Sequence, residues 1–241
     1  MLVKLDNPQL LSRIVEIISE LVTEVRIKFS EYGMSINAID PANVAMVSFK
    51  LPKSAFSQFE SGNEVLGINL DNLKQILKRC SSVSSLIIEN KENMLVINIQ
   101  DRIKRNFTLN LIEIEHEEKE FPELEYSSKI EISSIDLVAS IEDCAVVGDA
   151  CSFIVKENNF VIEAKGLNSA RSEFSSDEAK IEAEDCKSRY SIDYLQKFMK
   201  GARLCEKSIL QFANDHPLRL DFKRENMELV FLLAPRVEIE D

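Results

Sequence analysis

Two histidines, His116 and His216, are the side chains of this sequence that could exchange protons near neutral pH. Neither has a serine or cysteine at the spacing of a known nucleophile motif, and the phosphate loops G-x-G-x-x-G and G-x-x-x-x-G-K are missing. Aspartate and glutamate are abundant, but carboxylates form a catalytic pair only where a pocket separates their pKa values. We therefore expect no catalytic residues and no enzyme. A hydrolase that uses paired carboxylates is kept as a distant alternative.

The cysteines do not have the spacing of a metal site. Their number is odd and no two are separated as in C-x-x-C, so we expect reduced thiols and neither a zinc site nor a disulfide framework. Two of them, Cys144 and Cys151, could meet in space. No metal and no cofactor is predicted. The cysteines are Cys80, Cys144, Cys151, Cys186 and Cys205.

The charge of the chain is strongly acidic, with a formal net charge of -12. Taken alone, this charge argues against nucleic-acid binding, because contact with phosphates needs lysine and arginine. The acid is concentrated in residues 114–125, 177–185 and 238–241, however, and two predicted helices have basic faces. A protein that is acidic overall can still present one positive face. The basic residues are Lys74, Lys78 and Arg79 in one helix, and Lys197, Lys200, Arg203 and Lys207, just past its end, in the other.

These two helices belong to matching halves of the chain. Asn69–Lys78 aligns without gaps on Ser191–Lys200, an offset of 122 positions (191 − 69). Each half also begins with a short strand and an amphipathic helix, at residues 8–22 and from Ser133 or Ser134 to about residue 147. Alternating apolar and polar residues predict strands elsewhere. The pattern predicts a tandem duplication of one α+β unit, an antiparallel sheet with two helices on one face.

An acidic stretch between the halves is predicted to be an extended connector. Its carboxylates repel one another, and Pro122 disfavours a helix. It nevertheless keeps Phe121, Leu124 and Tyr126, which a simple spacer would not need. We assign residues 1–113 to an N-terminal domain, 114–128 to the connector and 129–241 to a C-terminal domain.

The sequence resembles a known family at several places. The most specific matches are the end of the chain, Leu232-Leu233-Ala234-Pro235-Arg236-Val237-Glu238, and the early turn, Ile39-Asp40-Pro41-Ala42-Asn43-Val44-Ala45. Residues 10–16, 121–126 and 216–220 also fit. Over its whole length the chain resembles sliding clamps of the proliferating cell nuclear antigen type, in the archaeal and eukaryotic form. The resemblance implies two tandem clamp domains in a trimeric ring that encircles duplex DNA, with sheets outside and helices lining the channel.

The resemblance also implies which residues face the DNA. Lysine and arginine on the helices of such clamps attract phosphates without reading bases, so that the ring slides. One departure is that the first helix of the second half carries Asp136, Glu142 and Asp143 and has no lysine or arginine. We therefore expect a channel less positive than is usual in the family. The implied DNA-facing residues are Arg13, Lys74, Lys78, Arg79, Lys197, Lys200 and Arg203.

A pocket for partner proteins is implied as well. In the family an apolar hollow under the connector takes a partner's short peptide, whose aliphatic and aromatic side chains fill it. Without the resemblance, Leu232 and Leu233 would be interpreted simply as a last core strand. The residues that match this pocket are Ile39, Asn43, Val44, Phe121, Pro122, Pro217, Leu232, Leu233, Ala234 and Pro235.

The resemblance also implies how subunits assemble and which partners they bind. Family subunits join through edge strands, which here are Asn106–Ile114 of one chain and Ala170–Ser175 of the next. The implied partners are double-stranded DNA, DNA polymerase, the clamp loader, flap endonuclease, DNA ligase and repair factors. A specialised subunit that works only in a heterotrimer is the alternative to a homotrimer. No apolar run is long enough to span a membrane and no secretory signal is visible, so we expect a cytoplasmic, nucleoid-associated protein of an archaeon.

Overall fold

The computed structural model describes residues 1–115 and 119–236. His116 and the acidic residues 238–241 therefore lie outside the described residues. The chain divides into two compact units. The first comprises Met1–Pro41, Val47–Phe121 and Glu225–Glu228, and the second comprises Ala42–Met46, Pro122–Arg224 and Leu229–Asp241.

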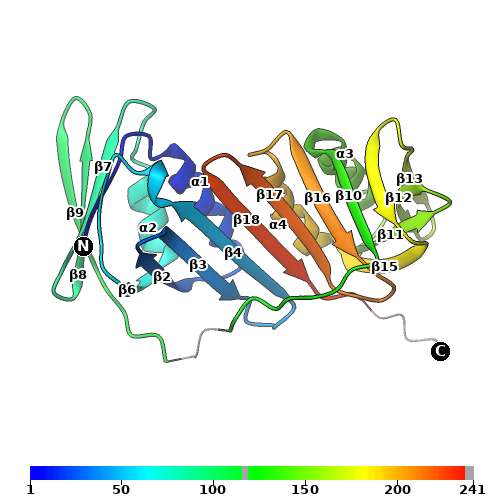
Figure 1. Ribbon diagram of the computed structural model, residues 1–241, viewed down its shortest axis with the longest axis horizontal. Helices are drawn as coiled ribbons and strands as arrows, with labels where there is room; N and C mark the ends of the chain where they lie inside the picture. The colour runs from blue at the N-terminus through cyan, green and yellow to red at the C-terminus, as the bar shows by residue number, and fades with distance from the viewer. Residues whose placement is uncertain (116–118, 237–241) are drawn as a thin grey trace. The chain divides into compact units, whose positions relative to one another are not determined.

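The first unit contains two runs of hydrogen-bonded strands and two helices (Figure 1). Neighbouring strands such as β7 and β8 are antiparallel, and their buried residues alternate with half-buried or exposed ones. Helices α1 (Gln9–Ile18) and α2 (Leu70–Leu77) lie on one side of the second run in Figure 1. The first run is β5 (Gln58–Glu60), β1 (Leu2–Leu5), β7 (Ser85–Lys91), β8 (Met94–Gln100) and β9 (Lys104–Asn110), and the second is β4 (Ala45–Pro52), β3 (Gly33–Ile39), β2 (Glu24–Ser30) and β6 (Glu64–Asn69).

The second unit repeats this arrangement. Helices α3 (Ser134–Ala145) and α4 (Ile192–Ala202) lie on one side of β10, β16 and β17 in Figure 1. One run of strands is β14 (Ala179–Ala183), β10 (Ser128–Ser133), β16 (Lys207–Phe212), β17 (Leu218–Arg224) and β18 (Met227–Leu233), and the other is β13 (Ser169–Phe174), β12 (Asn159–Lys165), β11 (Ala150–Lys156) and β15 (Cys186–Ser191). The predicted fold, two tandem α+β units built mainly from antiparallel sheet, is confirmed.

The helices form where apolar residues recur at helical spacing. In α2 the buried residues are Leu70, Leu73 and Leu77, and the side chain of Asn69 caps the helix by accepting a hydrogen bond from the Asn72 amide at 3.1 Å. In α4, Gly201 allows close packing, because an added Cβ would lie 3.0 Å from side-chain atoms of both Leu229 and Phe222. The helix faces therefore pack directly on the strands of their own unit.

Some boundaries differ from the sequence prediction. Helix α1 ends at Ile18 rather than at residue 22, and the Ser19 hydroxyl donates to the Glu16 carbonyl at 2.7 Å near that end. The short strands β5 and β14 were not predicted. Each pairs along its sheet with β1 or β10, which is a contact distant in sequence that local periodicity does not report.

Candidate functional site

The basic residues of the first unit lie on the exposed sides of α1 and α2. Arg13, Lys78 and Arg79 are exposed, and Lys74 is half-buried. The Lys74 ammonium contacts the Asp71 carboxylate at 2.7 Å and donates to the Ser19 hydroxyl at 3.1 Å. The hydrogen bond that Lys74 donates to Asp71 raises the pKa of the lysine. The helix pair thus presents the cations that the sequence predicted.

The second unit presents its basic residues mainly from α4. The Lys197 ammonium lies 5.1 Å from the ring centroid of Tyr194, within range of a cation–π interaction. Lys200 and Arg203 are exposed near the end of the helix. Neighbouring α3 shows Asp136, Glu142 and Asp143 to solvent, and its sequence SIDLVASIEDCA carries no basic residue. The two helices of this unit therefore offer charges of opposite sign.

Carboxylates on the first helix of each unit neutralise cations on the second helix. Glu16 of α1 contacts Lys78 at 3.1 Å, and Glu142 of α3 contacts Arg203 at 3.2 Å. The two glutamates are equivalent: their offset of 126 (142 − 16) equals that of the buried leucines Leu11 and Leu137 (137 − 11). Sequence reasoning assigned no role to Glu16, and it counted Glu142 only among the acidic residues expected to make the channel less positive. The sequence feature that could have pointed to them is that both glutamates occupy the same position on the solvent-exposed face of the first helix of each half.

The residues assigned to the partner pocket have different degrees of exposure. Leu232 and Leu233 end β18 with 5% and 0% exposure, so both belong to the core strand. Val44, Ala234, Pro235 and Pro217 are half-buried, whereas Asn43 and Pro122 are exposed. The Ala234 amide donates to the Val44 carbonyl at 2.9 Å, which places the turn and the chain end side by side in the second unit. Ile39 and Phe121, both half-buried, belong to the first unit.

The chain end continues past β18 and is held on the second unit. The Arg236 amide donates to the Arg189 carbonyl at 2.7 Å, and the Arg236 guanidinium contacts Asp149 at 2.7 Å. This guanidinium holds the pKa of Asp149 below its usual value. Sequence reasoning missed the Arg236–Asp149 pair because the two residues are far apart in the chain.

The connector is anchored to one unit at each of its ends. At its start, the Ile112 amide donates to the Gly67 carbonyl at 2.9 Å, and Arg26 donates to the Ile114 carbonyl. At its end, the ring of Tyr126 lies edge-on to the ring of His216, with 5.5 Å between centroids, and burial raises the pKa of the Tyr126 phenol to about 12. Tyr126 is therefore a structural anchor of the connector.

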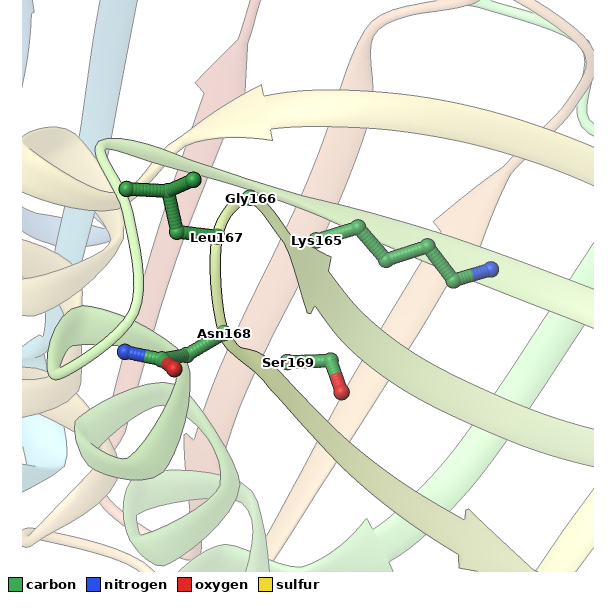
Figure 2. Close-up of a pocket in the computed structure, with 5 residues that line it drawn as sticks. All are labelled: Lys165, Gly166, Leu167, Asn168 and Ser169. Carbon is green, nitrogen blue, oxygen red and sulfur yellow. The ribbon is translucent and has the colours of Figure 1, made fainter.

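Several strands end a sheet and leave one edge unpaired within the described residues. Among them, β9 in the first unit and β13 in the second overlap the segments expected to join subunits. The turn from Lys165 to Ser169 connects β12 to β13 and lines a shallow hollow, with Leu167 and Asn168 pointing to one side and Lys165 to the other (Figure 2). Leu167, in this turn, is fully exposed.

The cysteines Cys144 and Cys151 and the histidine His216, considered above for chemistry, have contacts typical of structural residues. Cys144 and Cys151 are buried and hydrogen-bonded to each other, which raises the pKa of Cys151 and lowers that of Cys144. His216 packs against Tyr126, and its backbone carbonyl accepts from the Tyr190 hydroxyl at 2.7 Å. In the part of the chain that the structure describes, no cluster of histidine, cysteine or carboxylate side chains is arranged to hold a metal. No helix among the described residues is long and apolar enough to cross a membrane.

Comparison with known proteins gives consistent results along the whole chain. Residues 1–120 match the family model "Proliferating cell nuclear antigen, N-terminal domain", and residues 120–237 match the model of the C-terminal domain. The chain is 37% identical over 228 residues to the "DNA polymerase sliding clamp" of Thermococcus onnurineus, covering 91% of this chain and 92% of that protein. It is 39% identical over 228 residues to the "DNA polymerase sliding clamp 1" of Thermococcus kodakarensis, with the same coverage.

Solved structures resemble the chain closely too. A crystal structure of the proliferating cellular nuclear antigen from Entamoeba histolytica has a TM-score of 0.91 and 27% identity, and the match covers 98% of each chain. A chain of the PCNA2–PCNA3 complex from Sulfolobus tokodaii has a TM-score of 0.89 at 23% identity, covering 99% of this chain and 100% of that one, a likeness that shows the fold alone.

Proposed function

Because the chain belongs to the proliferating cell nuclear antigen family of sliding clamps, we propose that three copies of it form a closed ring around duplex DNA. The observation that carries this proposal is the match of both halves to the two clamp domains, together with their duplicated structure. Members of this family are processivity factors and not enzymes. The expectation of a non-enzymatic protein is thereby confirmed, and the hydrolase alternative is dropped.

The proposed DNA contact uses the basic residues of the helices. Lysine and arginine side chains attract the phosphates without contacting the bases. The ring is therefore held near the duplex at any sequence and can slide along it. The exposure of Arg13, Lys78 and Arg79 on one helix pair, and of Lys200 and Arg203 on the other, supports this role. Lys74 and Lys197 are less exposed and supply charge close to the same helix surfaces.

The proposed ring closes through the strands β9 and β13. Strand addition at an open edge pairs backbone groups that would otherwise face water, and head-to-tail pairing of β9 with β13 leaves neither of these two edges free once the ring is closed. Exposed Leu167, in the turn before β13, supports an interface at this edge because a subunit contact would cover it. One chain carries both edges, so three copies of it can close a ring, and a heterotrimer is the alternative outcome of the test.

Native mass spectrometry tests the assembly. The expected result is a species with the mass of three identical chains, lost when Leu167→Asp places a charge in the interface. Lys156→Asp, a surface change at the other end of the β11–β12 hairpin, serves as the control and should leave the trimer intact. A wild-type protein that stays monomeric alone and assembles only with other clamp chains would instead establish the heterotrimer.

We also propose that polymerase, clamp loader, flap endonuclease, ligase and repair factors dock through short peptides at the pocket named above. The half-buried side chains of Val44 and Pro235 support this, because they are partly open to a ligand beside the core residue Leu233. The acidic connector favours peptides with basic flanks. The bounds of the connector, residues 114–128, stay a prediction. We propose that a clamp of this kind works at the nucleoid.

Titration with a labelled clamp-binding peptide tests the pocket. Replacing Leu233 would remove a fully buried side chain and cost about 2–5 kcal/mol of stability, so it is a poor probe. Val44→Ala with Pro235→Ala removes apolar contacts at the surface and should weaken peptide binding about tenfold or more. Val65→Ala, which truncates an exposed valine of β6, is the matched control. Equal peptide affinity in the double variant and the control would remove the pocket from the proposal.

A further inference from the structure

Two cross-helix ion pairs use glutamates at equivalent positions of the two units. Their cations are not positional equivalents, because Lys78 aligns with Lys200 and Arg203 lies three residues further along. Glu16 contacts Lys78 at 3.1 Å in the first unit, and Glu142 contacts Arg203 at 3.2 Å in the second. In each case the carboxylate comes from the first helix of the unit and the cation from the end of the second helix. Two independent halves of a duplicated chain thus place a negative charge against a cation proposed to touch DNA.

Stability does not explain these pairs. The side chains of Glu16 and Lys78 are 48% and 55% exposed, and those of Glu142 and Arg203 are 58% and 68% exposed. Ion pairs between side chains this open to water contribute little to folding. The helices are held instead by their buried faces, for example by Ile14 and Leu73 in the first unit. The pairs therefore have their main effect on the charge that each surface presents.

Their electrostatic effect opposes phosphate binding. A DNA phosphate that approaches Lys78 or Arg203 must displace the glutamate or bind with that carboxylate close by, and like charges repel at this range. A cation already paired with a carboxylate also contributes less to the release of counter-ions that drives binding to DNA. Asp71 beside Lys74 and the exposed Asp136 and Asp143 of α3 act in the same direction.

We propose that Glu16 and Glu142 are built-in counter-ions that weaken the grip of Lys78 and Arg203 on DNA. The inference rests on the proposed DNA contact of the helices and adds that the strength of this contact is held down by two specific carboxylates. A ring that is linked to DNA by its closed shape does not need tight phosphate binding to stay in place. Weak contacts lower the energy barriers between successive positions along the duplex, which favours sliding.

The test compares DNA affinity in charge variants of the full chain. Glu16→Gln with Glu142→Gln removes both counter-ions and keeps the size of the side chains. Glu89→Gln with Glu182→Gln removes the same number of charges from strand glutamates, which contact Lys91 at 2.6 Å and Lys180 at 2.7 Å, and so controls for net charge. Binding of a labelled duplex with free ends, onto which a closed ring can thread, is followed by fluorescence anisotropy from low to physiological salt, and native mass spectrometry checks that each variant assembles like the wild type.

The helix variant should bind the duplex about threefold more tightly than the strand control at low salt, with a steeper dependence on salt. Equal affinity and equal salt dependence in the two glutamine variants would overturn the inference. Lys78→Ala with Arg203→Ala separates the two ways in which it can fail. If this variant binds DNA more weakly while the glutamine variants are alike, the DNA contact stands and only the counter-ion role is wrong. If it binds as tightly as the wild type, the proposed DNA contact of these residues fails as well.

Discussion

At the scale of single residues, Gly67 of β6 holds the segment that leads from β9 to the connector. An ideal Cβ at this position would lie 2.1 Å from the carbonyl oxygen of Ile112, and that contact is to backbone, which cannot rotate away. The Ile112 amide donates to the Gly67 carbonyl at 2.9 Å, so the segment lies tight against the strand. Glycine is needed here because of this close approach between backbones.

Gly67→Ala should therefore destabilise the first unit by about 1–3 kcal/mol, since the added methyl group forces the segment off β6. Urea unfolding measures the change. Gly62→Ala is the matched control, because an added Cβ there meets nothing within 4 Å. Equal unfolding midpoints for the two alanine variants would show that the close approach does not constrain the chain.

At the scale of elements, the segment after β18 is positioned by contacts on both sides. The Ala234 amide donates to the Val44 carbonyl at 2.9 Å, and the Arg236 amide donates to the Arg189 carbonyl at 2.7 Å. The ion pair of Arg236 with Asp149 fixes the side chain that follows Pro235. We infer that this pair helps to orient Pro235 for the peptide that it is proposed to contact.

Arg236→Asp should lower the affinity for a clamp-binding peptide about fivefold, because it sets two carboxylates against each other and releases the segment. Adding Asp149→Arg restores an ion pair of opposite polarity and should recover most of that loss. Peptide titration by fluorescence anisotropy gives both values. Lys180→Asp, a charge reversal on β14, controls for net charge. Failure of the double variant to recover affinity would assign the effect to the arginine itself and not to the pair.

At the scale of the whole molecule, the acidic charge is partly offset by ion pairs whose carboxylates have lowered pKa values. For Asp101, the backbone amide of Ile103 is the main cause, with Ser84 and Arg105 adding to it. For Glu131 the main cause is Lys207, and for Asp149 it is Arg236. Burial alone would raise the pKa of Glu163, but Lys165 and Arg171 outweigh it and the net direction is downward. Each of these carboxylates favours the folded state in its charged form.

The sign of the resulting pH dependence follows. A carboxyl group whose pKa is lower in the folded state contributes stability above its unfolded pKa of about 4 and loses it as pH falls through the folded value. The thermal unfolding midpoint should be flat from neutral pH to about pH 5 and then fall below about pH 4. Differential scanning calorimetry across this range checks it. Asp101→Asn should reduce the fall of the unfolding midpoint at acid pH more than Asp136→Asn, which changes an exposed residue of α3. An identical fall in the two variants would contradict the stabilising role given to the Asp101 carboxylate.

The sequence by itself determined the elements and their repetition. Helical spacing in α2 and α4 and alternation in the long strands are local patterns, and the gapless match of Asn69–Lys78 with Ser191–Lys200 revealed the duplication. Family motifs at Ile39–Ala45 and Leu232–Glu238 then gave the function, since such motifs combine residue types at fixed positions.

Only the tertiary structure decided which charges meet and which strands are completed by distant partners. The pairing of Glu16 with Lys78 and of Arg236 with Asp149, the close contact of Gly67 with Ile112, and the short strands β5 and β14 all join residues far apart in the chain. A glutamate on a wet helix face looks the same in sequence whether it faces water or a lysine of another helix. The physical reason is that ion pairs and close backbone approaches depend on distances in space, which a local pattern of residue types does not encode.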